Sequence, residues 1–335
     1  MSNQPVRSVA QDKELGKIQA GSKGKDRRWI KTFWEQYSVA FAFIILVVLA
    51  ALISDSFLSL ANIKNVLRQI SIVGILSIGM TFVILLGGID LSVGSVLAVS
   101  GTVVMAAQVN YGLPIPVSIL LGLAAGAFIG LINGLLITYG KITAFITTLA
   151  MMTVARSVAL YYADAGAISG SSSAYSKIGN AYLLGIPVPV IIFAVTALLG
   201  YVLLEKTVFG RRIYAVGGNL QAARLSAVPV FRITILTYVI CGLTASIGAV
   251  IETARLNSVS TSSSGYMYEL DAIAAVIIGG TSLAGGRGRL VGTIFGILIL
   301  GVLSNILNLV NISPYIQGVV KGAIILTAVM LQKRD

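Results

Sequence analysis

The stretch Leu85–Ser95, LLGGIDLSVGS, places two glycines and an aspartate inside a long apolar run. A charged side chain at the centre of a bilayer costs about 2.5–3.5 kcal/mol, so such a residue tends to face a partner or a cavity. Gly87 and Gly88 weaken a helix, whereas Asp90 is a residue type that commonly starts one. The stretch therefore predicts a helix that breaks near residues 87–91 and then restarts.

The composition of the whole chain agrees with a membrane location for this break. The 335 residues are 56% hydrophobic and 11% charged, and the mean hydropathy is +0.93. Apolar segments of roughly 20 residues, the length that crosses about 30 Å of hydrocarbon, recur between Gly, Pro and charged residues. The fold class is therefore all-α, a polytopic transmembrane helical bundle rather than a barrel.

Ten spans are predicted, which places both termini on one side of the membrane. Positive charge collects in cytoplasmic loops, and 18 of the 24 Lys and Arg residues fall in the segments assigned to the cytoplasm. Both termini are thus expected in the cytoplasm, with 1–33 as a basic tail and 34–335 as the transmembrane domain. The predicted spans lie at about 38–54, 65–86, 91–108, 114–138, 143–162, 187–204, 232–254, 270–281, 291–309 and 315–331.

A second glycine pair suggests an internal repeat. The sequence GGTSL at 279–283 resembles GGIDL at 87–91, with Ser282 at the position of Asp90. An even number of spans separates the two copies, so the repeat would be parallel.

The span at 114–138 carries Gly122, Gly126, Gly130 and Gly134, which are four residues apart and share one helix face. Such a face allows two backbones to approach closely. We expect it to serve helix packing rather than to line a substrate path.

Two roles are open for Asp90. Its carboxylate can cap the restarting helix by accepting the amides near Ser92 and Val93. It can also line a translocation path, because a broken helix at membrane depth is tolerated only where it is buried in protein or lines water. The candidates for the path or the helix break are Gly87, Gly88, Asp90, Ser92 and Ser282.

The longest internal cytoplasmic loop, about 205–231, contains a short predicted helix over 220–228. Asn219 is a good N-cap, and Pro229 stops the helix. The segment LQAARLSAV is small and apolar apart from Gln221, Arg224 and Ser226, which favours docking into a groove of another protein over a solvated loop helix.

The outward loops at 163–186 and 255–268 are rich in Ser, Gly and Tyr, and four charged residues, Glu252, Arg255, Glu269 and Asp271, cluster around the second. These loops are either solvated caps or a surface on which a soluble partner lands. The candidates for contact with such a partner are Glu252, Arg255, Tyr266 and Tyr268.

Several kinds of chemistry are excluded. The chain has no histidine, and its one cysteine, Cys241, lies in an apolar run, which removes the common zinc ligands, histidine triads and a disulfide framework. The segment Gly16–Gly21 is followed by Ser22 instead of the lysine of a phosphate loop. We expect no catalytic residue, no metal and no cofactor in this chain. The net charge of +12 is attributed to membrane topology, with lipid and not nucleic acid as the surroundings.

Three long blocks resemble the membrane permease of ribose-type sugar ABC importers. They are GMTFVILLGGIDLSVGSVLAVSG, GRRIYAVGGNLQAARLSAV and YELDAIAAVIIGGTSLAGGRGRLVGT, and the resemblance runs from about Trp34 to the C-terminus. The basic tail lies outside it.

This resemblance implies a transport subunit, not an enzyme, in the bacterial inner membrane. It implies a homodimer that forms the translocation path, a separate cytoplasmic ATPase that uses ATP and Mg, and an extracytoplasmic sugar-binding protein. The segment 218–226 matches the coupling helix that docks on the ATPase. The coupling residues implied by this match are Gly218, Asn219, Ala222, Ala223, Arg224 and Leu225.

An ion-coupled secondary transporter is the alternative. In that case Asp90, Glu252 and Arg156 would be the coupling groups at a broken helix. The sequence leaves open which sugar is carried and whether Arg156 pairs with Lys321 inside the bundle.

Overall fold

The computed structural model describes residues 39–331, so the predicted tail 1–33, the boundary at residue 34, Lys333 and Arg334 lie outside the described residues. The described part is a bundle of apolar helices. Six of its helices are long and apolar enough to cross a membrane, and three more are apolar but shorter. The predicted class of a polytopic helical bundle is confirmed.

The helices follow the predicted spans with shifts of a few residues. The first is Val39–Ile53. The others are α2 (Leu60–Leu85), α3 (Val93–Val109), α4 (Ile115–Thr138), α5 (Ala144–Tyr162), α6 (Ser173–Asn180), α7 (Val188–Tyr201), which continues as the π-helix η1 (Val202–Lys206), α8 (Val208–Gly218), α9 (Leu220–Leu225), α10 (Val230–Leu256), α11 (Tyr268–Ile278), α12 (Leu290–Leu309) and α13 (Pro314–Leu331).

The span predicted at 270–281 differs from the others. It corresponds to α11, which has 11 residues and at 1.5 Å per residue is only about 16 Å long. The chain continues from it as a loop over 279–289 before α12 begins. This segment is therefore half a span followed by irregular backbone.

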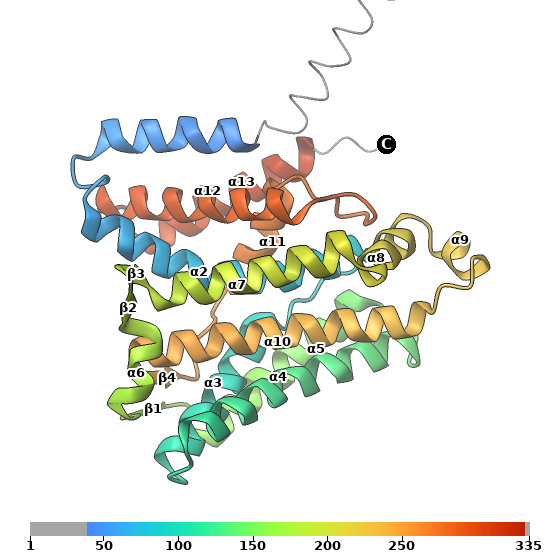
Figure 1. The fold of residues 1–335 in the computed structure, drawn as a ribbon, viewed down its shortest axis with the longest axis horizontal. Coiled ribbons are helices and arrows are strands. Elements are labelled where there is room, and N and C mark those ends of the chain that lie inside the picture. Colours follow the sequence, from blue (N-terminus) through green and yellow to red (C-terminus); the bar gives the residue numbers. More distant parts are fainter. Residues whose placement is uncertain (1–38, 332–335) are drawn as a thin grey trace, which may run out of the picture.

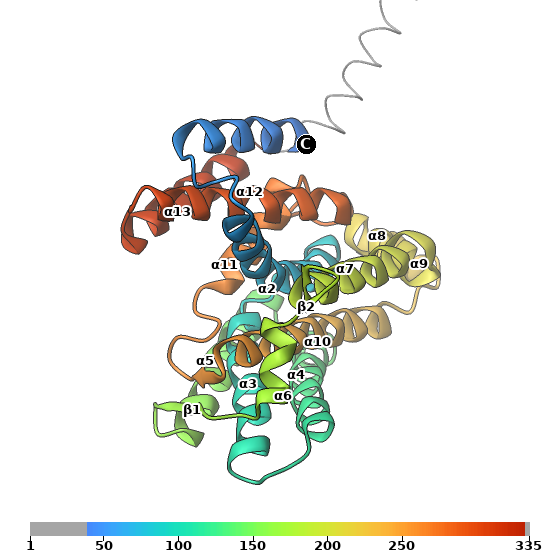
Figure 2. The ribbon, with the colours of Figure 1, turned by 60° about the vertical axis from the view of Figure 1, so that its left-hand side comes forward.

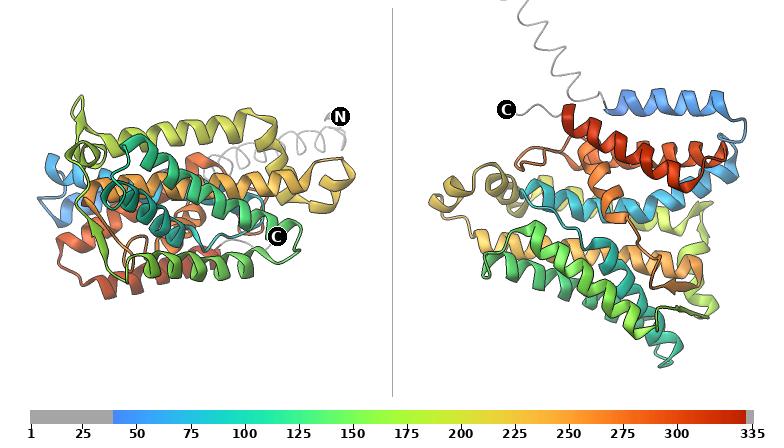
Figure 3. Two further views of the ribbon diagram at one scale, coloured as in Figure 1. Left: turned by 90° about the horizontal axis from the view of Figure 1, so that it is seen from below. Right: turned by 180° about the vertical axis from the view of Figure 1, so that it is seen from behind.

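The two most buried long helices, α2 and α10, form the centre of the bundle. The helix α10 packs against α4, α2 and α3, and α2 also contacts α7, α11 and α12. In Figure 1 the helices α2, α7 and α10 run roughly side by side, with the first helix, α12 and α13 on one flank and α4 and α5 on the other. Seen from behind, α13, α11 and α5 share one face (Figure 3).

The two ends of the bundle differ. One end holds α6 and two small two-stranded antiparallel sheets. In one sheet β1 (Ala167–Ser169) pairs with β4 (Ser258–Ser260), and in the other β2 (Tyr182–Leu183) pairs with β3 (Ile186–Pro187). Here α6 lies against the end of α10 (Figure 2). The opposite end holds α8 and α9 (Figure 1). The loops predicted to face outward and the loop predicted to dock thus lie at opposite ends.

The glycine face of α4 packs closely against its neighbours, as predicted. Gly122, Gly126, Gly130 and Gly134 are all buried. A Cβ atom at Gly130 would collide with the Tyr238 carbonyl of α10, and one at Gly134 would lie 2.7 Å from the Ile235 Cα. Only glycine therefore permits this approach of the two backbones.

We predict that Gly130→Val destabilises the protein by about 1–3 kcal/mol, because the added side chain must push α10 away from α4. Ala124→Val is the matched control, since Ala124 is an exposed position of the same helix. The measurement is the fraction of detergent-solubilised protein that stays monodisperse as the temperature rises. Equal loss in the two variants would contradict the packing role.

Candidate functional site

The break between α2 and α3 is built around two residues, Asp90 and Ser92. Asp90 is only 2% exposed, and its Oδ1 atom accepts hydrogen bonds from the Ser92 amide (2.9 Å) and the Ser92 hydroxyl (2.6 Å). The N-cap of α3 is Ser92, without a side-chain cap bond. The predicted contact with the Ser92 amide is confirmed, but the prediction that Asp90 itself is the N-cap was wrong. Asp90 precedes the cap by two residues and instead closes a local turn.

Other helices complete the polar surroundings of the break. Asn133 of α4 donates from Nδ2 to the Ser92 hydroxyl (3.0 Å). Thr148 of α5 accepts from the Leu91 amide (3.1 Å). The Cys241 thiol of α10 lies beside the Asp90 carboxylate, and no basic side chain within residues 39–331 forms an ion pair with that carboxylate. Asp90 is therefore held by neutral donors, and its buried carboxylate stabilises the break.

The second break, after α11, has the same backbone pattern as the first. Gly87 and Gly280 both have positive φ, +88° and +85°, which favours glycine. The amide of each of these glycines donates to the carbonyl three residues earlier in the chain. The following amide donates to the carbonyl five residues earlier, Gly88 to Val83 (3.0 Å) and Thr281 to Val276 (3.2 Å). This pair of hydrogen bonds is a Schellman motif.

This pattern corrects the register of the predicted repeat. Gly87 corresponds to Gly280, not to Gly279, because Gly279 is the right-handed C-cap of α11 and takes the place of Leu86. Ser282 therefore corresponds to Ile89 and does not stand where Asp90 does.

The two breaks meet at α8. The Gly286 amide donates to the Leu85 carbonyl (2.9 Å) and so joins the loop after α11 to the end of α2. A Cβ at Gly217 of α8 would collide with the Leu85 carbonyl, and one at Gly285 would lie 2.9 Å from both the Gly217 carbonyl and the Gly87 Cα. We call Gly87, Gly217, Gly285 and Gly286 the glycine junction. It brings the backbones of α8 and both breaks into direct contact, an arrangement the sequence did not predict.

A side chain strengthens the contact between α8 and the second break. The Tyr214 hydroxyl donates to the Gly288 carbonyl (2.9 Å) and lies 3.3 Å from a Glu205 carboxylate oxygen. Burial, together with the nearby Glu205 carboxylate, raises the pKa of Tyr214. The phenol therefore keeps its proton and acts as a donor at neutral pH.

The short helix α9 projects from this end of the bundle. Asn219 caps it as predicted, with its Oδ1 accepting from the Ala222 amide (2.9 Å). The helix ends at Leu225, and not at residue 228 as predicted, because Ala227 adopts a positive φ of 56°. Leu225 is 90% exposed, and Arg224 is also exposed.

The buried side of α9 faces the first break. Ala223 packs with Val216 of α8 and Val230 of α10, and Leu86 of the break packs against this group. Among the residues implied as coupling residues, Ala223 is thus buried against the bundle, while Gly218, Asn219, Ala222, Arg224 and Leu225 are exposed. One face of α9 therefore packs against the bundle, and the opposite face is exposed.

At the other end, Arg156 of α5 anchors the loop that follows β4. Its guanidinium donates to the carbonyls of Thr261 and Ser264, both at 2.8 Å. Lys321 of α13 instead forms an ion pair with Asp271 of α11 (2.9 Å). Arg156 and Lys321 therefore do not pair with each other.

The four residues predicted to contact a soluble partner lie near this loop with different exposures. Tyr266 is 64% exposed and Glu252 is only 4% exposed, whereas Arg255 and Tyr268 are half-buried. Tyr266 is therefore free to meet a partner, while Glu252 lies beneath the surface.

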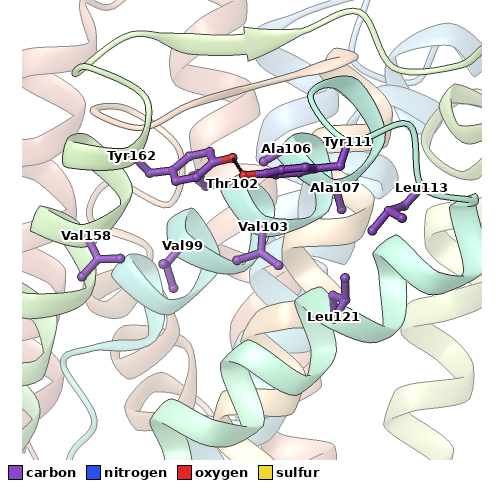
Figure 4. A pocket seen from close by; sticks show the side chains of 10 residues that line it. All are labelled: Val99, Thr102, Val103, Ala106, Ala107, Tyr111, Leu113, Leu121, Val158 and Tyr162. Atoms are coloured by element: carbon purple, nitrogen blue, oxygen red, sulfur yellow. Dashed lines mark hydrogen bonds between the residues drawn. The ribbon is translucent and has the colours of Figure 1, made fainter.

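A separate apolar pocket lies between α3, α4 and α5 (Figure 4). Val99, Val103, Leu121 and Val158 contribute to its lining, and Tyr111 and Tyr162 approach each other over it with their hydroxyls 3.4 Å apart. An aliphatic lining of this kind does not provide the hydrogen bonds that a polar solute needs. We do not count it as part of the functional site.

Comparisons with known proteins relate the chain to membrane transport permeases. Residues 62–329 match the family model described as branched-chain amino acid transport system / permease component. The chain is 49% identical over 292 residues to the ribose import permease protein of Bacillus subtilis, covering 87% of this chain and 90% of that protein. It is 43% identical over 314 residues to the ribose import permease protein of Escherichia coli K12, covering 92% and 97%. It is 38% identical over 304 residues to the L-arabinose transport system permease protein of the same strain, covering 90% and 91%. No solved structure matches the chain significantly.

We predict that Ser92→Ala lowers the free energy of unfolding by about 2–4 kcal/mol, because it leaves both Asp90 and Asn133 short of a buried partner. Ser77→Ala is the control: Ser77 is equally buried, but its hydroxyl donates only to the Val73 carbonyl of its own helix (2.8 Å), so about 1 kcal/mol is expected. Unfolding in mixed micelles measures both. A Ser92 variant no less stable than the control would show that the break does not depend on this bond.

Proposed function

The chain belongs to the branched-chain amino acid transport system / permease component family, and we propose that it is the membrane permease of an ATP-driven, binding-protein-dependent importer of ribose or a related monosaccharide. Its identity to the ribose import permeases, 43–49%, exceeds the 38% to the L-arabinose and the 35% to the xylose permease proteins. The chain is a transport subunit and not an enzyme. The observation that carries the proposal is α9, a capped helix that exposes one face and packs with its other face on α8 and α10 next to the helix break.

A cytoplasmic ATPase would dock on the exposed face of α9. Leu225 and Arg224 protrude there, and an apolar side chain next to a cation suits a groove with an acidic rim. In this proposal Gly218, Asn219, Ala222 and Ala223 give α9 its shape and contact with the bundle. ATP and Mg would be bound and used by the ATPase.

The proposed mechanism is a population shift. ATP binding would close the ATPase and move α9, and the glycine junction would pass this movement to both breaks because their backbones touch α8. The bundle would then favour an outward-facing state that accepts sugar, and hydrolysis would reset it. A ligand shifts such an equilibrium only through contacts that differ between the two states.

We further propose that the end with α8 and α9 faces the cytoplasm of the bacterial inner membrane, together with both termini. Arg211, Arg212 and Arg224 lie at this end, in line with the excess of positive charge in cytoplasmic loops. The opposite end would receive an extracytoplasmic sugar-binding protein. Tyr266 and Arg255 are the residues proposed to contact it.

A second copy of the chain is proposed to cover the face with α5, α11 and α13 (Figure 3). The paired side chains of Lys321 and Asp271 are 27% and 22% exposed. Charged groups facing lipid are costly, so a partner subunit or a water-filled path on this face suits them better than acyl chains.

We predict that Arg224→Glu abolishes ATP-driven sugar uptake while the permease still inserts into the membrane, because the reversed charge meets the acidic rim of the proposed groove. Lys141→Glu is the matched control, a charge reversal at an exposed residue of the α4–α5 loop. Uptake of labelled ribose by cells with equal amounts of each permease is the measurement. Undiminished uptake in the Arg224 variant would overturn the coupling assignment.

A second variant separates docking from transmission. Gly217→Ala is expected to leave the complex with the ATPase intact but to lower uptake about tenfold or more, because its Cβ pushes α8 off the Leu85 carbonyl and the Gly286 amide. Ala215→Val adds bulk to an exposed position of the same helix and serves as the control. Co-purification of the ATPase together with uptake measures both steps. Normal uptake in the Gly217 variant would show that the junction does not transmit.

A further inference from the structure

A polar pocket of about 220 Å³ lies beneath the loop that follows β4, at the end opposite α9. Helix α2 contributes Ile72, and the remaining walls come from the end of α10, the β4 loop and the start of α11. Its lining residues are Ile72, Glu252, Arg255, Leu256, Ser258, Ser260, Ser263, Ser264 and Tyr268.

The pocket contains a buried carboxylate that the protein leaves incompletely satisfied. Glu252 is 4% exposed, and its Oε2 atom has no hydrogen-bond partner among the residues that the structure describes. The side chains of Ser264 and Tyr268 lie beside the same carboxylate. A buried acceptor without a donor is costly, so a ligand hydroxyl that reached this carboxylate from the pocket would be stabilised.

The rest of the lining can both donate and accept hydrogen bonds. Serine and tyrosine hydroxyls do both, and Arg255 only donates. Arg156 fixes this wall by binding the carbonyls of Thr261 and Ser264, so the serines are presented by an anchored loop. A lining with both donors and acceptors complements a molecule with several neighbouring hydroxyl groups.

The size and charge of the pocket argue against a drug-sized molecule and against a calcium ion. Its volume is below the range of about 300–1,000 Å³ typical of sites for drug-sized molecules. A Ca²⁺ ion requires about 6–8 oxygen ligands, usually with several carboxylates, whereas Glu252 is the only carboxylate in this lining and Arg255 opposes a cation.

We propose that this pocket is a sugar subsite of the permease, in which Glu252 accepts hydrogen bonds from the hydroxyls of a monosaccharide before it enters the path. The inference rests on the proposed function and adds a place where the permease itself recognises the substrate. A subsite at the outer end provides a place on the permease to which the sugar can transfer when the binding protein releases it. Binding there is expected to be weak, since a tight site would hinder passage.

The test uses the permease and its ATPase in lipid nanodiscs without the binding protein, with D-ribose as the probe and saturation-transfer NMR as the readout. Glu252→Gln keeps the shape but removes the charge, and binding is expected to weaken about tenfold or more, the effect of losing a charge-assisted hydrogen bond. Asp164→Asn is the control, because Asp164 is an exposed acid of the neighbouring outward loop. If Glu252→Gln does not fold, Ser263→Phe fills the pocket from an exposed position and is expected to abolish binding.

Ribose binding that is lost in the Glu252 or Ser263 variant but kept in the control supports the subsite. No binding to the wild-type complex, or equal binding to all variants, overturns it. If Glu252→Gln changes only the affinity for the binding protein and leaves ribose binding unchanged, the subsite is also overturned. Glu252 is then assigned to docking of the binding protein. ATP-dependent ribose uptake by the wild-type importer is measured in parallel: its absence would refute the proposed function, whereas normal uptake without ribose binding refutes only the subsite.

Discussion

In hydrocarbon every backbone N–H and C=O group needs a partner within the protein, and this constraint governs how the bundle can interrupt its helices. At both breaks the left-handed glycine, Gly87 or Gly280, lets the last amides turn back onto the helix. Asp90 then satisfies the Ser92 amide, and the Leu85 carbonyl receives the Gly286 amide. Because one break supplies a donor to the other, they form a single unit and do not behave as two separate defects.

The glycines of the junction are explained by the same constraint. For α8 to rest against both breaks, three backbone segments must come within contact distance, and a Cβ at Gly217, Gly285 or Gly286 would force them apart. Direct contact between backbones leaves no flexible side chain to absorb a displacement. In the proposed mechanism a movement of α8 is therefore transmitted to α2 and to the loop before α12, as closely packed cores transmit strain.

Local features of the chain were predictable from the sequence, and contacts between distant segments were not. The lengths of the apolar segments predicted the helices, and Gly87 and Gly88 predicted the first break. The four-residue spacing from Gly122 to Gly134 predicted the close packing of α4, and Asn219 predicted where α9 starts. The half-length of α11 and the register of the second break depend on which glycine adopts a positive φ, and the sequence GG does not say which one does. The junction and the contact of Tyr214 with Gly288 join residues at least 68 positions apart. The glycine pairs at 217–218 and 285–286 can be seen in the sequence, but the sequence does not say which distant segment each pair contacts.

The helix α10 connects the two functional ends. It has 27 residues, about 40 Å of helix, and begins at Val230 in contact with Ala223 of α9. Near its other end Glu252 enters the polar pocket. Between them the glycine face of α4 and the length of α2 enclose it, so it cannot bend without disturbing close contacts on both sides. A rigid helix of this kind would move its two ends together, which means that the coupling surface and the outer pocket respond to the same displacement.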